Sequence, residues 1–152
     1  MPSFMRQIRV IGRCSNIYHT AALEGTGLSG GHTAYLFTLC RTPGMSQEQL
    51  SRHIYVNKSN VTRHLAQLEK LGYVERRQSV EDKRVILVYP TQKAYDILPR
   101  VTDIIKGWNS YLTEEFTEEE MEQFNAMLAR ITERATAAVN RQIDKSWESD
   151  DR

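Results

Sequence analysis

The chain has 152 residues, of which 40% are hydrophobic, enough for one compact domain or two small lobes. No apolar run approaches the roughly 20 residues of a membrane span, and the first residues lack the apolar segment of a signal peptide. The two cysteines, Cys14 and Cys40, match neither a metal-binding spacing nor a disulfide framework. We therefore expect a cytoplasmic protein in a reducing compartment, with no membrane partner, no metal and no cofactor.

Charge is distributed unevenly along the chain, although the net charge is only +1. Between Arg52 and Arg84, eight Lys and Arg residues accompany four acidic residues, whereas from Thr113 to the end eleven acidic residues accompany five basic ones. A basic centre is suited to contact phosphate, while the ends of the chain contact each other. The distribution favours a nucleic-acid partner for the centre of the chain.

Residues 4–24 have the pattern of a long amphipathic helix. Its inner positions recur every three or four residues and form a face too wide for a helix that stands alone. They are Phe4, Ile8, Ile11, Ser15, Tyr18 and Ala22, flanked by Val10, Cys14 and Ile17. Glycines between residues 25 and 31 then indicate a loop. A phosphate-binding loop is excluded because no strand precedes it and no Lys-Ser/Thr follows it. Residues 32–41 are apolar on most sides and predict a core helix.

The middle of the chain begins with signals for two short helices. Ser46, with Gln49 three residues later, has the form of a capping box, which predicts the start of a helix. Leu50 and Ile54 give this helix one apolar stripe. Asn57 is a favourable N-cap for the next helix. We therefore expect two helices separated by a sharp turn.

The second of these helices has one apolar and one polar face. The apolar face comprises Val61, Leu65, Leu68 and Leu71. Gly72 closes the helix where a left-handed residue is favoured. The opposite face comprises Lys58, Ser59, Asn60, Thr62, Arg63, His64 and Gln67. A helix that is merely solvated usually carries acidic residues in its first turn, whereas this one has none before Glu69, so we expect a negatively charged partner.

Two runs rich in β-branched and aromatic residues, 73–78 and 85–89, predict a β-hairpin. Its polar tip contains Ser79, Glu81, Asp82, Lys83 and Arg84. Asp82 is expected to hold the Arg84 guanidinium, because alternate residues of a strand share a face. Two helices at a sharp turn followed by a basic hairpin form a winged helix-turn-helix, which is a DNA-binding shape.

Residues 57–91 resemble the MarR family of bacterial transcriptional regulators. The matching motif is S-x-V-T-R-x-L-x-x-L-E-x-x-G-x-[VI]-x-R from Ser59 to Arg76, followed by the D-x-R of the wing. Where the family pattern continues with Leu-Thr-x-x-Gly, this chain has Pro90-Thr91 and Ala94. From the helix, the wing and the resemblance we predict that double-stranded DNA is bound by Lys58, Ser59, Asn60, Thr62, Arg63, His64, Gln67, Arg76, Arg77, Asp82, Lys83 and Arg84.

Two further helices are expected after the wing. The first spans residues 91–112 and contains Pro99, which removes one internal hydrogen bond and predicts a bend. Thr117 and Glu120 form a second capping box, with Phe116 placed to pack on the new helix. That helix continues a long apolar stripe, which comprises Met121, Phe124, Leu128, Ile131, Ala135, Ala138, Ile143 and Trp147.

Such a long stripe needs a partner surface, and a symmetric copy of the chain supplies one. The alternative is that the helix packs within its own chain. We predict a mainly α fold with a small β-wing (α+β). In it, a winged helix-turn-helix DNA-binding lobe spans residues 35–94, and a helical dimerisation region is formed by residues 1–34 and 95–152. The expected assembly is a homodimer.

These features distinguish three functional classes. A dimeric DNA-binding regulator agrees with the central motifs and with the family resemblance. A winged-helix protein-interaction module without DNA binding predicts an apolar or acidic outer face on the second helix, and this sequence has the reverse. An enzyme is rejected because no nucleophile–base pair or paired carboxylates occur at a useful spacing. The four histidines, His19, His32, His53 and His64, are too scattered to predict a metal site.

The family resemblance also implies an effector, often a small anionic aromatic ligand bound between the dimerising helices and the DNA-binding lobe. The candidate lining residues are Arg13, Tyr18, His19, His32 and Tyr35. Other members sense oxidants through a cysteine near the start of the chain. Here Cys14 has Arg13 beside it but lies within an apolar stripe, which favours a structural role. We therefore expect a repressor that binds a near-palindromic operator and is released by a small ligand.

Overall fold

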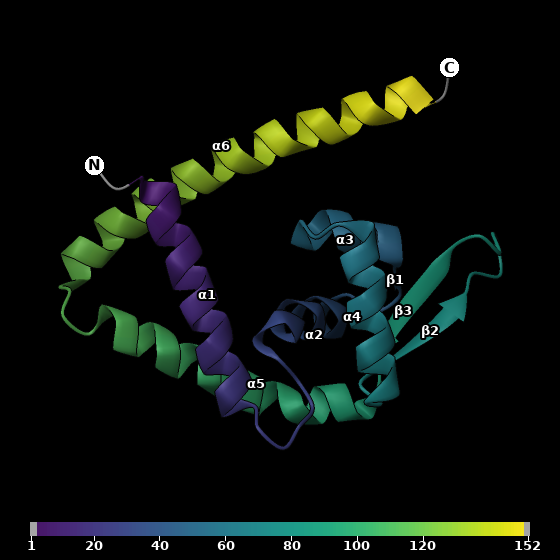
Figure 1. Cartoon of the computed structure of the whole chain (residues 1–152), viewed down its shortest axis with the longest axis horizontal. Coiled ribbons are helices and arrows are strands. Elements are labelled where there is room, and N and C mark those ends of the chain that lie inside the picture. Colours follow the sequence, from purple (N-terminus) through teal and green to yellow (C-terminus); the bar gives the residue numbers. More distant parts are fainter. Residues whose placement is uncertain (1–2, 151–152) are drawn as a thin grey trace. The chain divides into compact units, whose positions relative to one another are not determined.

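The computed structural model describes the backbone of residues 3–150 and the side chains of residues 3–143. The chain forms two compact units that divide after Asn109. The elements in chain order are α1 (Phe4–Ala22), the 3-10 helix η1 (Gly30–His32), α2 (Thr33–Arg41), β1 (Met45–Ser46), α3 (Gln47–Ile54), α4 (Lys58–Lys70), β2 (Val74–Gln78), β3 (Ile86–Pro90), α5 (Gln92–Thr113) and α6 (Glu118–Asp150) (Figure 1). The predicted class, mainly helical with a small β-wing, is confirmed. Over the described residues, none of the helices has the length and apolar character needed to cross a membrane.

The glycine-rich segment after α1 is a loop only as far as Ser29. Gly30 opens η1, where a side chain is excluded because a Cβ would lie 2.7 Å from the side-chain oxygen of Asn16. The Gly30 N–H also donates to Thr20 Oγ1 at 2.8 Å. The end of the expected loop is therefore a short helical turn packed closely on α1.

Local capping interactions set the boundaries of α3 and α4. Ser46 Oγ accepts from the Gln49 N–H at 3.0 Å, and Gln49 Oε1 accepts from the Ser46 N–H at 2.9 Å, so the predicted capping box is confirmed. Asn57 is the N-cap of α4, as predicted. Between the two helices Tyr55 has a φ of 56°, a left-handed conformation that is unfavourable for a residue with a Cβ. Gly72, with a φ of 83°, follows α4 as expected.

The three strands form one antiparallel sheet in the order β1-β3-β2. β2 and β3 form the predicted hairpin, which places Val74 opposite Pro90 at its base. No sequence pattern predicts β1, which pairs Met45 with Val88. A two-residue strand is too short to have a periodicity of its own, and it forms because β3 offers a free edge. This strand connects the residues before α3 to the hairpin.

The core of the first unit joins α2, α3, α4, the sheet and α5. Its buried hydrophobic residues are Leu23, Leu28, Tyr35, Leu36, Leu39, Leu50, Val61, Leu65, Leu68, Tyr73, Val74, Val88, Ala94 and Val101. The predicted apolar face of α4 is thus buried, except that Leu71 is only half-buried. α5 is tied to the end of α1 because the Arg100 guanidinium donates to the carbonyl oxygens of Ala22 and Glu24, at 2.9 and 3.3 Å.

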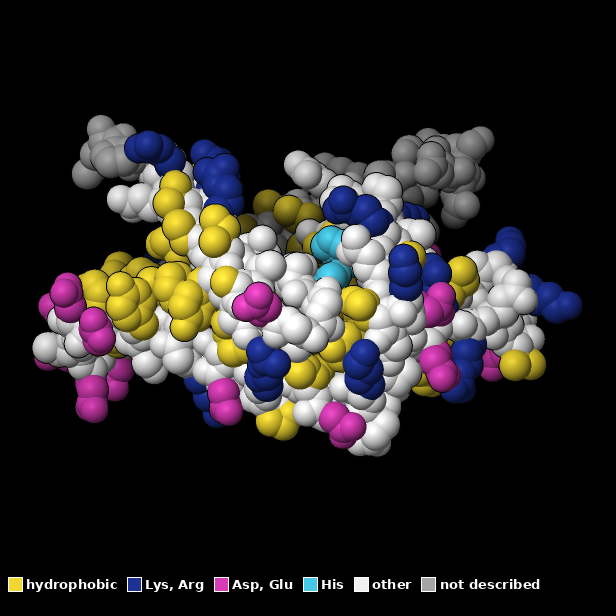
Figure 2. Space-filling model, turned by 60° about the horizontal axis from the view of Figure 1, so that its bottom comes forward, with side chains coloured by type: hydrophobic (Ala, Val, Ile, Leu, Met, Phe, Trp, Pro, Cys, Tyr) yellow, Lys and Arg dark blue, Asp and Glu magenta, His cyan; other side chains and the backbone are white. Residues whose placement is uncertain are grey.

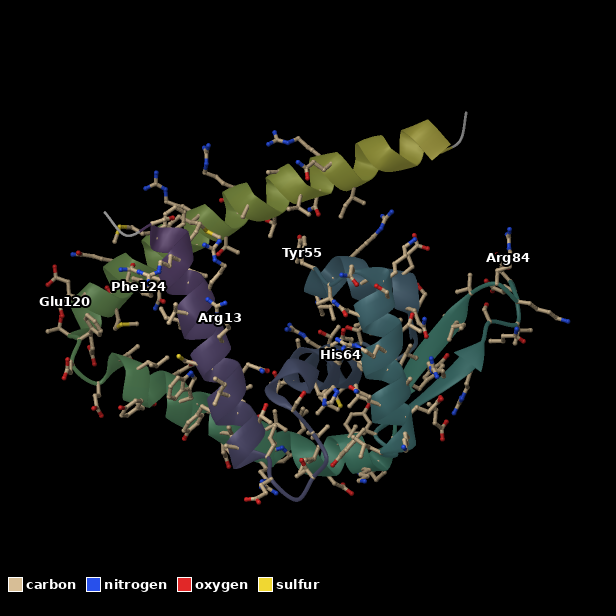
Figure 3. All side chains as sticks on the ribbon, in the orientation of Figure 1. Arg13, Tyr55, His64, Arg84, Glu120 and Phe124 are labelled. Carbon is tan, nitrogen blue, oxygen red and sulfur yellow. The ribbon has the colours of Figure 1, made fainter. Side chains whose placement is uncertain are left out.

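The second unit consists of the end of α5 and α6. The predicted capping box at its turn is confirmed, because Thr117 Oγ1 accepts from the Glu120 N–H at 3.2 Å and Glu120 Oε2 accepts from the Thr117 N–H at 2.9 Å. Figure 3 shows Glu120 and Phe124 on the first turns of α6. Large hydrophobic side chains are exposed along this helix, namely Phe124, Met127, Ile131 and Val139. Trp147, the last residue of the predicted stripe, lies outside the described side chains.

Candidate nucleic-acid interface

The first turns of α4 carry a connected set of polar side chains. Asn57 Oδ1 accepts from the Ser59 hydroxyl and from the Asn60 N–H, both at 2.9 Å. Asn60 Oδ1 in turn accepts from Arg63 Nη2 at 3.0 Å. A guanidinium has five N–H donors, so Arg63 is oriented by Asn60 and still has donors for a phosphate or a base edge. This arrangement preorganises the exposed start of α4 for a polar, acidic partner.

The electrostatics of this helix start also favour an anion. The first turn of α4 contains no acidic residue. The amino end of a helix carries partial positive charge and N–H groups that lack partners within the helix. Lys58 and Thr62 are exposed on the same turns, and Thr62 Oγ1 donates to the Lys58 carbonyl oxygen at 3.0 Å. The predicted residues 58–63 therefore include a continuous surface that suits a DNA phosphate.

The structure corrects the predicted position of His64. This side chain is half-buried and projects from α4 towards α2 (Figure 3). Its ring packs edge-on against the rings of His32 and Tyr35, with centroid distances of 5.3 and 5.2 Å. Burial lowers the pKa of His64, and the nearby His32 and Arg63 lower it further. The expectation that His64 belongs to the outward polar face is wrong, because η1 and α2 cover that side of α4.

Gln67 also differs from its expected role as a purely outward side chain. It is exposed, but its Oε1 lies 3.1 Å from Nε2 of the buried His32. The two residues are 35 positions apart in the sequence, so no local pattern relates them. Gln67 therefore links α4 to η1, in addition to any contact that it makes outside the chain.

The wing tip presents Arg84 to solvent, with its side chain 90% exposed. Asp82 Oδ1 accepts from the backbone N–H and from Nε of Arg84, at 3.0 and 3.1 Å, and Asp82 Oδ2 accepts from Nη2 at 3.0 Å. These hydrogen bonds lower the pKa of Asp82, so the carboxylate stays ionised. The predicted pair is present, but it does not arise from the alternation of side chains along a strand, so the physical basis of that prediction is wrong. Both residues lie in a turn and not in a strand, and an Asp side chain commonly bonds the backbone two residues on.

The wing tip carries exposed cations, with the acidic Glu81 and Asp82 beside them. Lys83 is exposed beside Arg84. Figure 2 shows Lys and Arg side chains (dark blue) projecting at the right end of the view, where Figure 1 places the end of the hairpin. The tip is ordered by hydrogen bonds within the hairpin, including one from Gln78 Nε2 to the Lys83 carbonyl oxygen at 3.1 Å. The wing therefore offers cations on an ordered turn.

The two arginines at the base of the wing have partners within the chain. Arg76 donates to Glu69 of α4 twice, from Nη2 to Oε1 and from its backbone N–H to Oε2, both at 3.0 Å. These bonds lower the pKa of Glu69. Arg77 forms an ion pair with Glu75, with 2.7 Å between Nη2 and Oε2. Its guanidinium carbon lies over the Tyr89 ring, 4.7 Å from the ring centroid. Arg76 thus joins α4 to β2, a role that the prediction of direct DNA contact did not include.

Two of the predicted ligand-binding residues lie together on α1. Tyr18 stacks on Trp108 of α5, with centroids 4.4 Å apart and an interplanar angle of 19°. The His19 ring meets that of Tyr18 edge-on, with centroids 6.1 Å apart, and its buried Nε2 has no hydrogen-bond partner among residues 3–143. Arg13 is exposed on the same helix (Figure 3). The structure therefore brings Tyr18 and His19 together and leaves Arg13 at the surface.

The other two predicted ligand-binding residues are buried and meet through the ring of His64. Tyr35 is only 1% exposed, yet within the part of the chain that the structure describes its hydroxyl has no hydrogen-bond partner, and neither has the buried Nδ1 of His64. Burial raises the pKa of Tyr35 and lowers that of His32. Buried polar atoms are normally bonded to protein, water or a ligand. The structure therefore brings His32 and Tyr35 together around the ring of His64.

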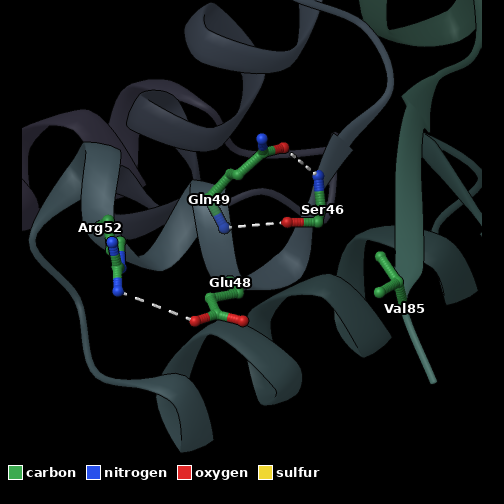
Figure 4. Close-up of a pocket in the computed structure, with 5 residues that line it drawn as sticks. All are labelled: Ser46, Glu48, Gln49, Arg52 and Val85. Carbon is green, nitrogen blue, oxygen red and sulfur yellow. Dashed lines mark hydrogen bonds and ion pairs between the residues drawn. The ribbon is translucent and has the colours of Figure 1, made fainter. Parts of the chain in front are cut away.

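A shallow pocket of about 280 Å³ lies beside α3 and the start of β3 (Figure 4). Its lining residues are Ser46, Glu48, Gln49, Arg52 and Val85. Ser46 and Gln49 already form the cap of α3. Glu48 Oε1 lies 4.0 Å from Arg52 Nη2. The prediction counted Arg52 in the basic centre but not in the DNA-binding set. Arg52 is exposed next to the wing because α3 packs beside the hairpin, and a pattern within one segment does not predict that contact.

The cysteines differ in environment. Cys14, which was expected to have a structural role within the apolar stripe, is exposed on α1. Cys40 is half-buried, and burial raises the pKa of its thiol, which disfavours the reactive thiolate. In the part of the chain that the structure describes, no three His, Cys, Asp or Glu residues are grouped so as to hold a metal ion.

Comparisons with known proteins agree with this geometry. The MarR family model matches residues 28–86. The uncharacterized HTH-type transcriptional regulator YybA of Bacillus subtilis (strain 168) is 25% identical over 97% of this chain and 93% of its own. The regulator YwoH of the same organism is 31% identical over 68% of this chain and 74% of its own.

A solved structure gives the same result for the fold. It is a putative MarR family transcriptional regulator from Listeria monocytogenes in complex with a 26mer DNA. The match has a TM-score of 0.81 and 25% identity, and it covers 91% of this chain and 92% of that one. Members of this family regulate transcription and are not enzymes. The chain belongs to the MarR family of winged helix-turn-helix, DNA-binding transcriptional regulators.

Proposed function

We propose that the protein is a repressor that binds a near-palindromic operator as a homodimer and is released by a small ligand. The observation that carries the proposal is the start of α4, which is exposed, free of acidic residues and organised by the Asn60–Arg63 hydrogen bond. Ser59, Asn60, Thr62 and Arg63 then read base edges and phosphates in the major groove. Arg84, held by Asp82, enters the adjacent minor groove.

The homodimer is supported by apolar surface that a single chain leaves in water. On α1 the exposed hydrophobic side chains are Phe4, Met5, Ile8, Val10, Ile11, Ile17 and Tyr18. On α6 they are Phe124, Met127, Ile131 and Val139. Apolar patches of this kind are rare on monomers and usually mark an interface. We assign residues 1–34 and 95–152 to dimerisation and residues 35–94 to DNA binding. A two-fold axis then presents two copies of α4 to half-sites about one helical turn apart.

Ligand release is supported by two buried polar atoms that have no hydrogen-bond partner among the described residues, the Tyr35 hydroxyl and His19 Nε2. A phenol or carboxylate of an anionic aromatic ligand has the groups that such atoms bond. The second candidate is release by oxidation of Cys14, and the observation that favours it is the exposure of this thiol on α1. The two candidates respond to different chemical signals, so they are separable by experiment.

The test is selection of bound duplexes from random DNA with the full-length chain, followed by release assays. A near-palindromic consensus is expected, and the free protein is expected to sediment as one species near twice 17.6 kDa. Selection of no duplex contradicts the repressor, and a monomer that binds with full affinity contradicts the homodimer. Small aromatic acids and peroxide are then added to the complexes of the wild type and of Cys14→Ser. Release of both proteins by an acid supports the ligand, whereas release by peroxide of the wild type alone assigns control to Cys14.

A further inference from the structure

The last turn of α3 places one arginine between the two surfaces that we assign to DNA. Arg52 is exposed in this turn, while Leu50 of the same helix is buried in the core. Arg52 lines the shallow pocket beside α3 together with Val85, the residue that follows Arg84 of the wing (Figure 4). On its other side the chain turns and begins α4 at Lys58. Arg52 therefore lies close to the wing and to the start of α4.

The turn that joins α3 to α4 supports this arginine rigidly. The Ser51 hydroxyl donates to the Val56 carbonyl oxygen at 2.5 Å, and the Val56 N–H donates to the Ser51 carbonyl oxygen at 3.2 Å. Both bonds lie next to Arg52 in the chain. Leu50 of α3 and Val61 of α4 are buried in the same core cluster. The position of Arg52 relative to the start of α4 is thus set by packing and by two hydrogen bonds.

The polar groups around Arg52 suit a phosphate. Ser46 and Gln49 already bond each other in the cap of α3, so Arg52 and Glu48 are the charged groups that line the pocket. Glu48 Oε1 lies 4.0 Å from Arg52 Nη2, which is beyond hydrogen-bond distance. An exposed pair of this kind is weak, so Glu48 does not hold the guanidinium away from a stronger acceptor. A phosphate is such an acceptor, because it can receive two parallel N–H bonds from one guanidinium.

The geometry of DNA brings a phosphate to this position. When the second helix of a helix-turn-helix lies in the major groove, the first helix crosses the sugar–phosphate backbone. In the proposed complex the start of α4 occupies the major groove and Arg84 the adjacent minor groove. The strand that separates the two grooves then passes between these two contacts, which is where Arg52 lies.

We propose that Arg52 binds a backbone phosphate of the strand between the two grooves, and that Glu48 weakens this contact by competing for the guanidinium. The contact is additional to those of the α4 start and the wing tip, and it presupposes the operator binding proposed above. Phosphates carry no sequence information, so Arg52 adds affinity and fixes the register of α4 on the duplex without selecting a base.

The first test is Arg52→Gln in the full-length chain, with affinity measured for a duplex selected as above and for an unrelated duplex. Affinity for both is expected to fall by up to about fivefold, as for one exposed ion pair. The slope against salt should become shallower by about one unit, so the deficit relative to the wild type shrinks about 3.5-fold between about 50 and about 200 mM salt. Arg52→Lys keeps the charge without the planar fork, and should recover the slope and part of the affinity.

Lys70→Gln is the matched control for net charge. Lys70 is exposed in the last turn of α4, at the end opposite the proposed reading residues, and its loss changes the charge of the chain equally. It is expected to keep the wild-type salt slope. The position of the contact is tested with duplexes that carry a neutral methylphosphonate at one phosphate. At one phosphate bordering the selected base pairs, the affinity lost by the wild type and by Lys70→Gln should not be lost by Arg52→Gln, whose contact is already missing.

Glu48→Gln is expected to change affinity in the opposite direction. It removes the carboxylate that competes for Arg52, so affinity for both duplexes should rise by up to about fivefold. The rise should be smaller when Arg52→Gln is also present, because only the repulsion between Glu48 and DNA is then relieved. A pair that merely stabilises α3 predicts no rise in affinity from either substitution.

Wild-type affinity and salt slope in Arg52→Gln overturn the proposal. So does an equal change of slope in Lys70→Gln, or a methylphosphonate scan in which Arg52→Gln matches the wild type at every phosphate. If Arg52→Gln does not fold, the scan is repeated with Glu48→Gln, whose gain must disappear at one neutral phosphate. A gain that persists at every position, or the absence of any gain, then overturns the proposal. Selection of no duplex by the wild type refutes the proposed function instead, and is distinguishable from all these results.

Discussion

The start of α4 and the tip of the wing each present an arginine that is held by a side-chain oxygen, but on very different supports. Arg63 is held by Asn60 one turn earlier on a helix whose opposite face is buried in the core. Arg84 is held by Asp82 two residues earlier, in a turn whose arginine side chain is 90% exposed. The position of Arg63 is therefore set by packing, whereas that of Arg84 is set by a local hydrogen-bonding pattern.

This difference teaches how a small domain divides specificity and affinity. A side chain on a rigid, packed element is held closely enough to distinguish one base edge from another. A side chain on an exposed turn supplies charge to a groove whose code is degenerate. We therefore expect substitutions on α4 to change which sequence is bound, and substitutions at the wing tip to change how strongly any sequence is bound.

The largest effect is expected for Arg63→Ala. Operator binding should lose about 1–3 kcal/mol, with relaxed base preference at particular positions, because a base-reading contact is removed. The measurement is affinity for the operator and for each of its single-base-pair variants. Arg41→Ala is the matched control, since Arg41 is an exposed arginine at the end of α2, outside the predicted DNA-binding set. An equal loss on all duplexes would show that Arg63 contacts only phosphates.

A smaller and more uniform effect is expected for Arg84→Ala. Affinity should fall by a similar factor for the operator and for unrelated duplexes. The slope of the logarithm of the binding constant against the logarithm of the salt concentration should become shallower by about one unit, as for the loss of one phosphate contact. Titration at several salt concentrations measures both quantities. Lys83→Ala removes the same charge from the neighbouring residue. Asp82 positions the side chain of Arg84 and not that of Lys83, so Lys83→Ala should have the weaker effect on affinity. If Arg84→Ala binds DNA with the affinity and the salt slope of the wild type, the prediction is contradicted, and the Asp82–Arg84 pair serves only to stabilise the wing.

The smallest effect is expected where the wing meets α4. Arg76→Met should reduce the free energy of unfolding by about 0.2–1 kcal/mol, the range for partly exposed ion pairs, and should leave the salt dependence of DNA binding unchanged. A double-mutant cycle with Glu69→Gln measures the coupling. The pKa of Glu69 is lowered in the folded chain, so this stabilisation is present above the ordinary Glu pKa of 4.5 and is lost as the pH falls below it. A reduced salt slope in Arg76→Met would assign Arg76 to DNA contact.

The helix starts could be predicted from the sequence because their interactions are local. The capping boxes of Ser46 with Gln49 and of Thr117 with Glu120 each span three residues, and Asn57 caps α4 in the same way. The wing pair of Asp82 and Arg84 is also local, so it was found even though its geometry was attributed to a strand. Interactions of this kind are encoded within one turn of chain and need no knowledge of the fold.

The same reasoning fails where the partner is distant in the sequence. β1 exists because β3 offers an edge to two residues before α3. Arg76 is joined to Glu69 across the turn that follows α4, a contact that no local pattern predicted. Each of these contacts depends on which elements pack together, and periodicity within one segment carries no such information.

By itself, the sequence determined the two amphipathic patterns of the DNA-binding lobe, its caps and its basic hairpin, because residues within one or two turns decide these features. Only the tertiary structure decided which polar residues of α4 are available to a partner. Periodicity assigns His64 and Gln67 to the outward face, but η1 and α2 pack beside that face, so His64 is enclosed by His32 and Tyr35, and Gln67 bonds His32. The physical reason is that the burial of a side chain depends on what packs against its helix, and here that element lies 35 residues earlier in the chain.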